Sequence, residues 1–150
     1  KTRERVLHLG ISQISGGSRT SVGGYYEPEP EDARSEQFDV SDTRSLDEVV
    51  RWLMEMDYIP SFCTACYREA RTGDRFMSLC KSGQIQNCCH PNALMTLKEY
   101  LMDYASPATK AIGDKLIERE VLNVPNEKAR AVVLENLRLI EQNNRRDFRF

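Results

Sequence analysis

Capped segments with helical periodicity dominate most of this 150-residue chain, from residue 45 to residue 143. Each segment begins with residues that satisfy the free N–H groups of a first helical turn, and each continues with apolar residues three or four positions apart. Such spacing places the apolar residues on one face of a helix. The sequence therefore predicts a mainly α-helical domain, and the predicted helix starts are Ser45 with Glu48 as a capping box, Pro91, Ser106 with Pro107, and Asn126.

The apolar stripes predict which side chains form the core. The expected inward-facing residues are Leu46, Val49, Val50, Trp52 and Leu53 in the first helix, Leu94, Leu97, Leu101 and Tyr104 in the next, Ile112, Leu116 and Ile117 in the third, and Ala129, Val132, Val133, Leu137 and Ile140 in the last.

The first part of the chain has a different pattern. Residues 6–14, "VLHLGISQI", are compatible with a β-strand that buries His8, and a glycine-rich stretch, "SGGSRTSVGG", follows them. Residues 25–44 are rich in proline and acidic residues without periodicity, which is typical of an extended connector. We therefore expect a strand and loop at residues 1–24, a connector at residues 25–44 and a helical domain at residues 45–150.

Composition limits the function classes. The formal net charge is −2, and the only basic run is the short stretch "RRDFRF", which disfavours nucleic-acid binding. No apolar run approaches the ~20 residues of a membrane span, so we expect no membrane insertion. Five cysteines is an odd number and no secretory signal is visible, so a complete disulfide framework is disfavoured. A cytoplasmic, reducing location with metal or redox chemistry fits better.

All five cysteines lie in one window, at positions 63, 66, 80, 88 and 89. Cys63, Cys66 and Cys89 form a C-x2-C-x22-C pattern, and the C-x2-C spacing can direct two sulfurs to one centre. Cys89 precedes a predicted helix start, where the helix N-terminus favours a thiolate. Cys80 and Cys88 lack such spacing, and the simplest interpretation is that they are buried without a chemical role.

Four interpretations of the window remain open at this stage. A thioredoxin-type redox pair expects a βαβ context that the sequence lacks. A structural zinc needs four ligands, which Cys63, Cys66 and Cys89 could complete with Cys88 or His90. A [4Fe–4S] cluster held by three cysteines would leave one iron open. Idle buried cysteines are the fourth interpretation. His90 is more simply a capping or solvent-facing residue, and Arg68, Arg71 and Arg75 either form a solvated face or balance the charge of an anionic cluster.

The stretch "CTACYREARTGDRFMSL…GQIQNCCHPNALMTLKEYL" resembles the C-terminal cluster-binding region of the radical SAM tyrosine lyases that mature [FeFe]-hydrogenase. "ISQISGGSRTSVGGY" is similar to the stretch that ends the (β/α)8 radical SAM barrel of that family. By this resemblance, Cys63, Cys66 and Cys89 would bind an auxiliary [4Fe–4S] cluster, as metal ligands, with an additional iron bridged by free cysteine.

The resemblance also implies an activity for the whole enzyme. A radical made from S-adenosylmethionine at a second [4Fe–4S] cluster cleaves tyrosine, and the products supply CO and cyanide to an iron unit on the auxiliary cluster. The implied partners are the barrel of the same protein, the CO, cyanide and free cysteine that reach the cluster, and other hydrogenase-maturation proteins. The chain lacks the C-x3-C-x2-C motif of the radical SAM cluster, so we expect a part that is not catalytic alone. The alternative function is a zinc-stabilised helical interaction module without catalytic chemistry.

Overall fold

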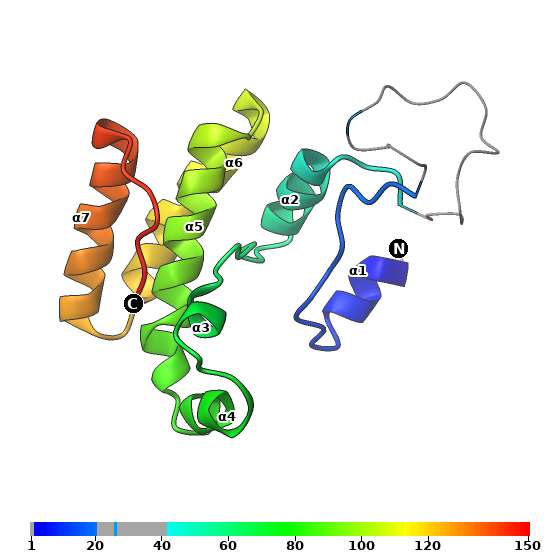
Figure 1. Ribbon diagram of the computed structural model, residues 1–150. Coiled ribbons are helices and arrows are strands. Elements are labelled where there is room, and N and C mark those ends of the chain that lie inside the picture. Colours follow the sequence, from blue (N-terminus) through cyan, green and yellow to red (C-terminus); the bar gives the residue numbers. More distant parts are fainter. Residues whose placement is uncertain (1, 21–25, 27–41) are drawn as a thin grey trace. The chain divides into compact units, whose positions relative to one another are not determined.

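The computed structural model describes residues 2–20, 26 and 42–150, which fall into two compact units, residues 1–49 and 50–150. Every regular element among these residues is a helix, so the predicted mainly α fold is confirmed (Figure 1). None of these helices is both long and apolar enough to cross a membrane. The elements are α1 (Thr2–Leu7), α2 (Leu46–Glu55), α3 (Ala65–Arg68), α4 (Gly73–Lys81), the 3-10 helix η2 (Gln84–Asn87), α5 (Cys89–Asp103), α6 (Pro107–Glu120), the 3-10 helix η3 (Val121–Asn123) and α7 (Glu127–Asn143).

The strand predicted over residues 6–14 is wrong. Its first residues belong to α1, which has Glu4 in its first turn and Arg5 in its last, the charge order that the helix dipole favours. Gly10 then takes a φ of 96°, and residues 11–20 contain neither helix nor strand. A strand needs a neighbouring strand for its backbone groups, and none of the described residues supplies one. His8, expected to be buried, is exposed.

The predicted connector lies mostly outside the described residues, which resume at residue 42 apart from residue 26. The capping box that follows it is confirmed. The Ser45 backbone N–H and hydroxyl both donate to Glu48 Oε2 at 2.8 Å, and the Glu48 N–H donates to Ser45 Oγ at 3.3 Å. On α2 the predicted residues Val49, Val50 and Leu53 are buried, whereas Leu46 is exposed.

Helix α5 packs between α6 and α7 and forms the centre of the second unit. Its predicted core residues Leu94, Leu97 and Leu101 are almost completely buried. Tyr104 is exposed because α5 ends one residue earlier, at Asp103. The helix also begins earlier than predicted, at Cys89, so that Pro91 lies inside its first turn, where its missing N–H costs no hydrogen bond.

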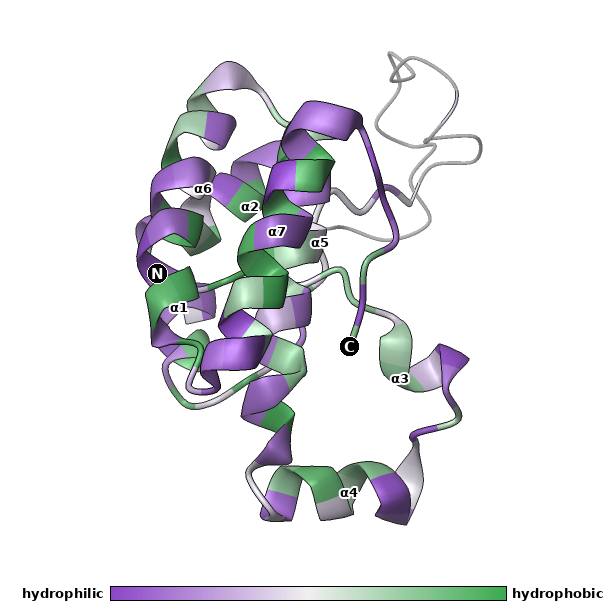
Figure 2. Ribbon diagram, turned by 90° about the vertical axis from the view of Figure 1, so that its left-hand side faces the viewer, coloured by the Kyte–Doolittle hydropathy of each residue, from purple (hydrophilic) through white to green (hydrophobic). Residues whose placement is uncertain are grey.

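The caps predicted for α6 and α7 are confirmed. Ser106 Oγ accepts the Thr109 N–H at 3.3 Å, and Asn126 Oδ1 accepts the Ala129 N–H at 3.1 Å. Figure 2 shows hydrophobic and hydrophilic residues alternating along α6 and α7, as expected for helices with one buried face. The predicted residues Leu116, Ile117, Val133, Leu137 and Ile140 are buried, Ile112 and Ala129 pack against them in part, and Val132 is exposed.

Helix α6 packs against α5 at Gly113 without a side chain between them. A Cβ atom at this position would lie 2.4 Å from Leu101 Cδ1 and 2.7 Å from Leu101 Cδ2. Because Leu101 is almost completely buried, it has little room to move. The absence of a side chain at Gly113 therefore sets the separation of these two helices.

We predict that Gly113→Ala destabilises the domain. Overpacking costs about 1–3 kcal/mol, which exceeds the ~1 kcal/mol that alanine gains over glycine inside a helix. Denaturant unfolding followed by circular dichroism measures the change. The second substitution Leu101→Ala should make Gly113→Ala less harmful than it is in the wild type, and strictly additive effects would contradict the proposed clash.

The ammonium of Lys98 is buried and paired with two carboxylates. Its Nζ lies 2.8 Å from Asp114 Oδ1 and 3.4 Å from Glu141 Oε1, and Asp114 also accepts from Lys110 Nζ at 2.9 Å. Burial acts to raise the pKa of Asp114, but the hydrogen bonds from Lys98 and Lys110 outweigh it and hold this pKa below 3.8. The ionised form of Asp114 is therefore favoured by folding.

We predict that Asp114→Asn lowers the free energy of unfolding at neutral pH by about 1–2 kcal/mol, because Lys98 loses its nearest charge partner. The folded pKa is depressed, so this stabilisation is present above the unfolded value of 3.8 and is lost as the pH falls through the folded value. Urea unfolding at a series of pH values should show the free energies of unfolding of the wild type and the variant converging at acid pH. Glu135→Gln, which breaks the exposed ion pair with Arg138, serves as the control and should change the free energy of unfolding little.

Candidate metal centre

The three cysteines of the C-x2-C-x22-C pattern come from two segments of the second unit. Cys63 precedes α3, Cys66 lies within it, and Cys89 is the first residue of α5. The residue before Cys63 fastens this segment to α5: the Phe62 ring stacks on Tyr100 with centroids 4.9 Å apart, and the Phe62 N–H donates to Thr96 Oγ1 at 3.3 Å.

These three cysteines line one cavity of about 360 Å³. Cys80 and Cys88 are not among the described residues in its wall. The three cysteines that share the C-x2-C-x22-C spacing thus border one cavity, and Cys88 lies beside Cys89. The other lining residues are Ser61, Tyr67, Arg71, Thr72, Gly73 and Phe76.

Cys80 and Cys88 have other surroundings. Cys80 lies on α4, which has no fully buried residue, so the expectation that Cys80 is a buried core cysteine is wrong. Cys88 lies between η2 and α5, and its Sγ is 3.8 Å from the carbonyl oxygen of Gln84 and 3.7 Å from that of Ile85. The Cys88 thiol is thus directed at the backbone of the preceding turn.

The Cys89 thiol is held in its neutral form by the protein around it. Burial, followed by the neighbouring thiols of Cys88, Cys66 and Cys63, raises the pKa of Cys89 to about 12. The position at a helix start was expected to favour a thiolate, but the effects of burial and of three nearby thiols are larger. A thiolate at Cys89 therefore needs positive charge beside it, such as a metal centre supplies.

The three thiols border a cavity of the domain. No three His, Cys, Asp or Glu side chains within the described residues are placed to ligate one metal ion together. Instead, Cys63, Cys66 and Cys89 surround a cavity. In a four-iron cluster each cysteine binds a different iron, so its sulfurs stand farther apart than those around one zinc. The cavity and its three soft ligands therefore fit such a cluster.

Arg71 adds a positive charge to the cavity wall. Its Nη2 donates to the carbonyl oxygen of Phe150 at 3.0 Å, while its buried Nε has no hydrogen-bond partner among the described residues. A buried N–H without a partner is costly, and Arg71 lines both this cavity and the pocket beside it. Of the three arginines that the sequence placed near the cysteines, only Arg71 lines this cavity; Arg68 pairs with Asp147 and Arg75 borders a neighbouring pocket.

His90 is not part of the cavity wall. Its Nε2 lies 4.0 Å from Glu120 Oε2 and makes no hydrogen bond to the described residues. The contact between Phe150 and Arg71 was missed by sequence reasoning, because the two residues are 79 positions apart and no local pattern connects them.

The fold and the site define a helical domain in which three cysteines on a C-x2-C-x22-C spacing border one cavity. A solved structure contains a domain similar to this one. The chain is similar to the crystal structure of HydG, a maturase of the [FeFe]-hydrogenase, with 50% identity and a TM-score of 0.88. The match covers 99% of this chain and 31% of the HydG chain, and it confirms the resemblance predicted from the sequence. Scans of protein-family models and of curated proteins gave no match.

We predict that the reduced, metal-free chain is alkylated slowly at Cys89. With a pKa of about 12, the reactive thiolate is scarce at neutral pH, and its amount should grow about tenfold with each pH unit through the alkaline range. Iodoacetamide labelling followed by peptide mass spectrometry gives the rate at each cysteine. A rate at Cys89 that levels off below pH 10 would contradict the described environment.

Proposed function

We propose that this chain binds a [4Fe–4S] cluster through Cys63, Cys66 and Cys89 and forms the cluster-binding part of a maturase of [FeFe]-hydrogenase. The observation that carries the proposal is the convergence of these three thiols on one cavity, in a chain that is 50% identical to part of HydG. The spacing of the cysteines and the cavity that Cys63, Cys66 and Cys89 line both support this choice of ligands.

The residues of the chain have separate roles in this proposal. The three thiolates hold the cluster, and Arg71 offsets negative charge and donates its free Nε–H to an anionic group. Tyr67 and Phe76 supply apolar surface to the wall. A cluster held by three cysteines would keep one iron without a protein thiolate, and the resemblance implies that CO and cyanide would be loaded on an additional iron beside the cluster.

The activity of the complete enzyme follows from the resemblance. It would be a radical SAM lyase that cleaves tyrosine with the help of S-adenosylmethionine and a second [4Fe–4S] cluster, and its products would reach the cluster site as CO and cyanide. Because the chain spans 31% of HydG and lacks the radical SAM cluster motif, radical formation belongs to a barrel outside this sequence. The role of this part is to hold the cluster and to receive those products together with free cysteine. It would act in the cytoplasm, alongside other hydrogenase-maturation proteins.

A zinc-stabilised helical interaction module is the second candidate. Cys88 lies close enough to Cys89 to raise its pKa, so a fourth thiol is near the triad. Metal analysis of protein purified in air separates the two candidates. One stoichiometric zinc that survives oxygen would favour the module, whereas a brown, oxygen-sensitive chromophore would favour the cluster.

We predict that each of Cys63→Ala, Cys66→Ala and Cys89→Ala abolishes or severely reduces the [4Fe–4S] content after anaerobic reconstitution with iron and sulfide. Iron and sulfide analysis, with EPR of the reduced sample, measures this content. Cys80→Ala and Cys88→Ala are matched controls, because they remove the same atoms outside the cavity and should load as the wild type does. A four-iron signal that survives all three triad substitutions would refute the proposal.

A further inference from the structure

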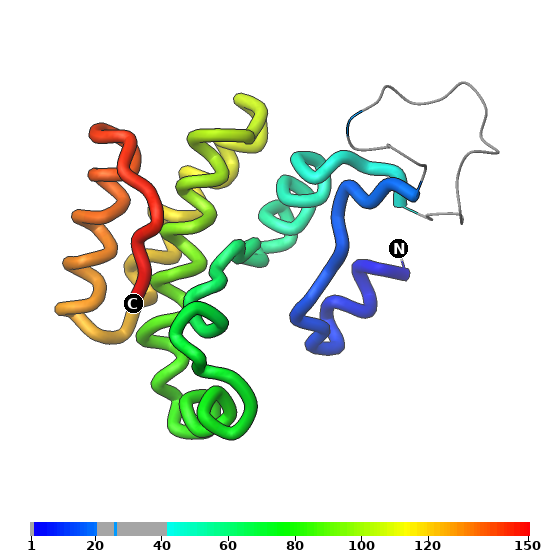
Figure 3. The backbone as a smooth tube through the Cα atoms, in the orientation of Figure 1, coloured from blue at the N-terminus to red at the C-terminus, as the bar shows by residue number. Residues whose placement is uncertain are grey.

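The residues after α7 run back beside α5 toward α3 (Figures 1 and 3). Asn144 ends α7 in the left-handed conformation, with a φ of 52°, which reverses the chain direction. Arg146 then pairs with Asp103 at the end of α5. The last four residues of this stretch, Asp147–Phe150, are called the clamp segment here.

One side of the clamp segment is hydrogen-bonded to α5. The Asp147 N–H donates to Glu99 Oε1 at 2.8 Å, and the Phe150 N–H donates to Asn92 Oδ1 at 2.8 Å. Asn92 is buried and lies in the first turn of α5, three residues after Cys89. The clamp segment is thus attached directly beside the helix start that carries the third cysteine of the triad.

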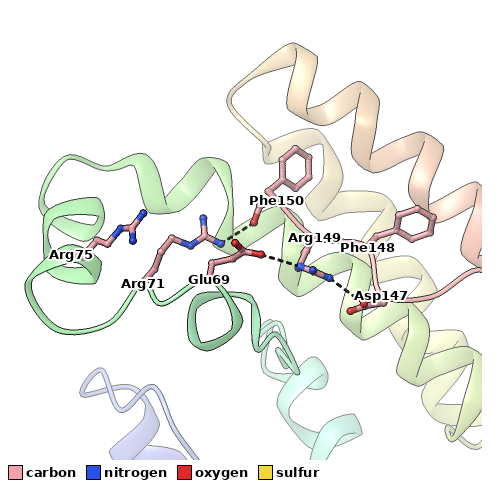
Figure 4. Close-up of a pocket in the computed structure, with 7 residues that line it drawn as sticks. All are labelled: Glu69, Arg71, Arg75, Asp147, Phe148, Arg149 and Phe150. Carbon is pink, nitrogen blue, oxygen red and sulfur yellow. Dashed lines mark hydrogen bonds and ion pairs between the residues drawn. The ribbon is translucent and has the colours of Figure 1, made fainter.

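The other side of the clamp segment is attached to the residues that follow Cys66. Arg68 binds the Asp147 carboxylate with both of its terminal nitrogens, one of them 2.9 Å from Oδ2. Arg149 Nε lies 3.6 Å from Glu69 Oε1, and Arg71 Nη2 donates to the Phe150 carbonyl oxygen at 3.0 Å. Figure 4 shows Glu69 and Arg71 reaching the clamp segment across a pocket of about 540 Å³.

The Cys66 segment needs such external contacts. Helix α3 has four residues, far fewer than the ~12 that an isolated helix requires for stability. Phe62 and the buried Ala65 fasten its beginning to the domain, while residues 67–70 are exposed. The three contacts to the clamp segment fix the other end of α3 and the loop that brings Arg71 to the cavity.

We propose that the clamp segment positions Cys66 and Arg71 relative to Cys89, so that Asp147–Phe150 are positioning residues for the cluster. The cluster in this inference comes from the proposed function, whereas the contacts of the clamp segment do not depend on that function. The clamp segment joins the two thiol-bearing segments, and its contacts to Arg68, Glu69 and Arg71 span 79 or 80 positions of sequence. Apart from Arg71, the residues that make this connection do not line the cysteine cavity among the described residues.

The charge reversal Arg68→Glu tests the proposal, because it sets two carboxylates against each other where Arg68 now binds Asp147. Arg68 is about half exposed, so the substitution leaves the core intact. The matched control is Arg138→Glu, which reverses an equally exposed arginine paired with Glu135 on α7. Asp147→Asn is a milder second variant that suits the left-handed φ of 68° at this position, and the double variant Arg68→Glu, Asp147→Asn should recover part of the loss.

Two measurements on the full chain are made. In the metal-free protein, hydrogen exchange followed by mass spectrometry should be faster over residues 65–71 in Arg68→Glu and Asp147→Asn, and unchanged in Arg138→Glu. On anaerobic reconstitution, the iron concentration for half-loading should rise about threefold or more in Arg68→Glu and stay at the wild-type value in Arg138→Glu.

The outcomes separate this proposal from the proposed function. A wild-type chain that takes up no cluster refutes the function, while the exchange measurement still tests the clamp geometry. Equal exchange in Arg68→Glu and Arg138→Glu overturns the clamp. Faster exchange with unchanged loading overturns its role in positioning the cluster. Faster exchange with weaker loading, both relieved in the double variant, supports it.

Discussion

The burial of α5 is the constraint on which the rest of the second unit depends. Three of its leucines are almost completely excluded from solvent, α6 approaches it closely at Gly113, and α7 covers another face. The same helix begins at Cys89, accepts the Phe62 contact through Thr96 and Tyr100, and anchors the clamp segment through Asn92 and Glu99. The candidate site is therefore built on the most buried helix of the domain, to which Phe62, Ala65 and the clamp segment attach the Cys63–Cys66 side.

Residues with strong local preferences were predictable from the sequence. The caps at Ser45, Ser106 and Asn126 each satisfy backbone N–H groups within three residues, so no distant part of the chain is needed to specify them. The choice of three cysteines among five was also accessible, because the spacing of Cys63, Cys66 and Cys89 distinguishes them from Cys80 and Cys88. Their convergence on one cavity agrees with that choice without testing what they bind.

Features that depend on distant residues could not be predicted. Tyr104 follows the apolar spacing of α5, yet it lies just past the helix end and is exposed. Residues 6–14 have an apolar run that suits either a strand or a helix, and the presence of neighbouring strands decides between them. The protonation of Cys89 was misjudged because a helix start favours the thiolate, while burial and three nearby thiols, known only from the fold, act against it. The partner of Arg71 is likewise set by the path of residues after α7.

The long separation between the clamp segment and its partners affects the order of events during protein synthesis. Translation proceeds from the N-terminus, so Cys63, Cys66 and Cys89 leave the ribosome well before residues 147–150, which lie 79 positions beyond Arg68 and Arg71. Until those residues are made, the segment around Cys66 lacks its second attachment. The arrangement of the segments that carry the three cysteines is therefore complete only after residues 147–150 have been made.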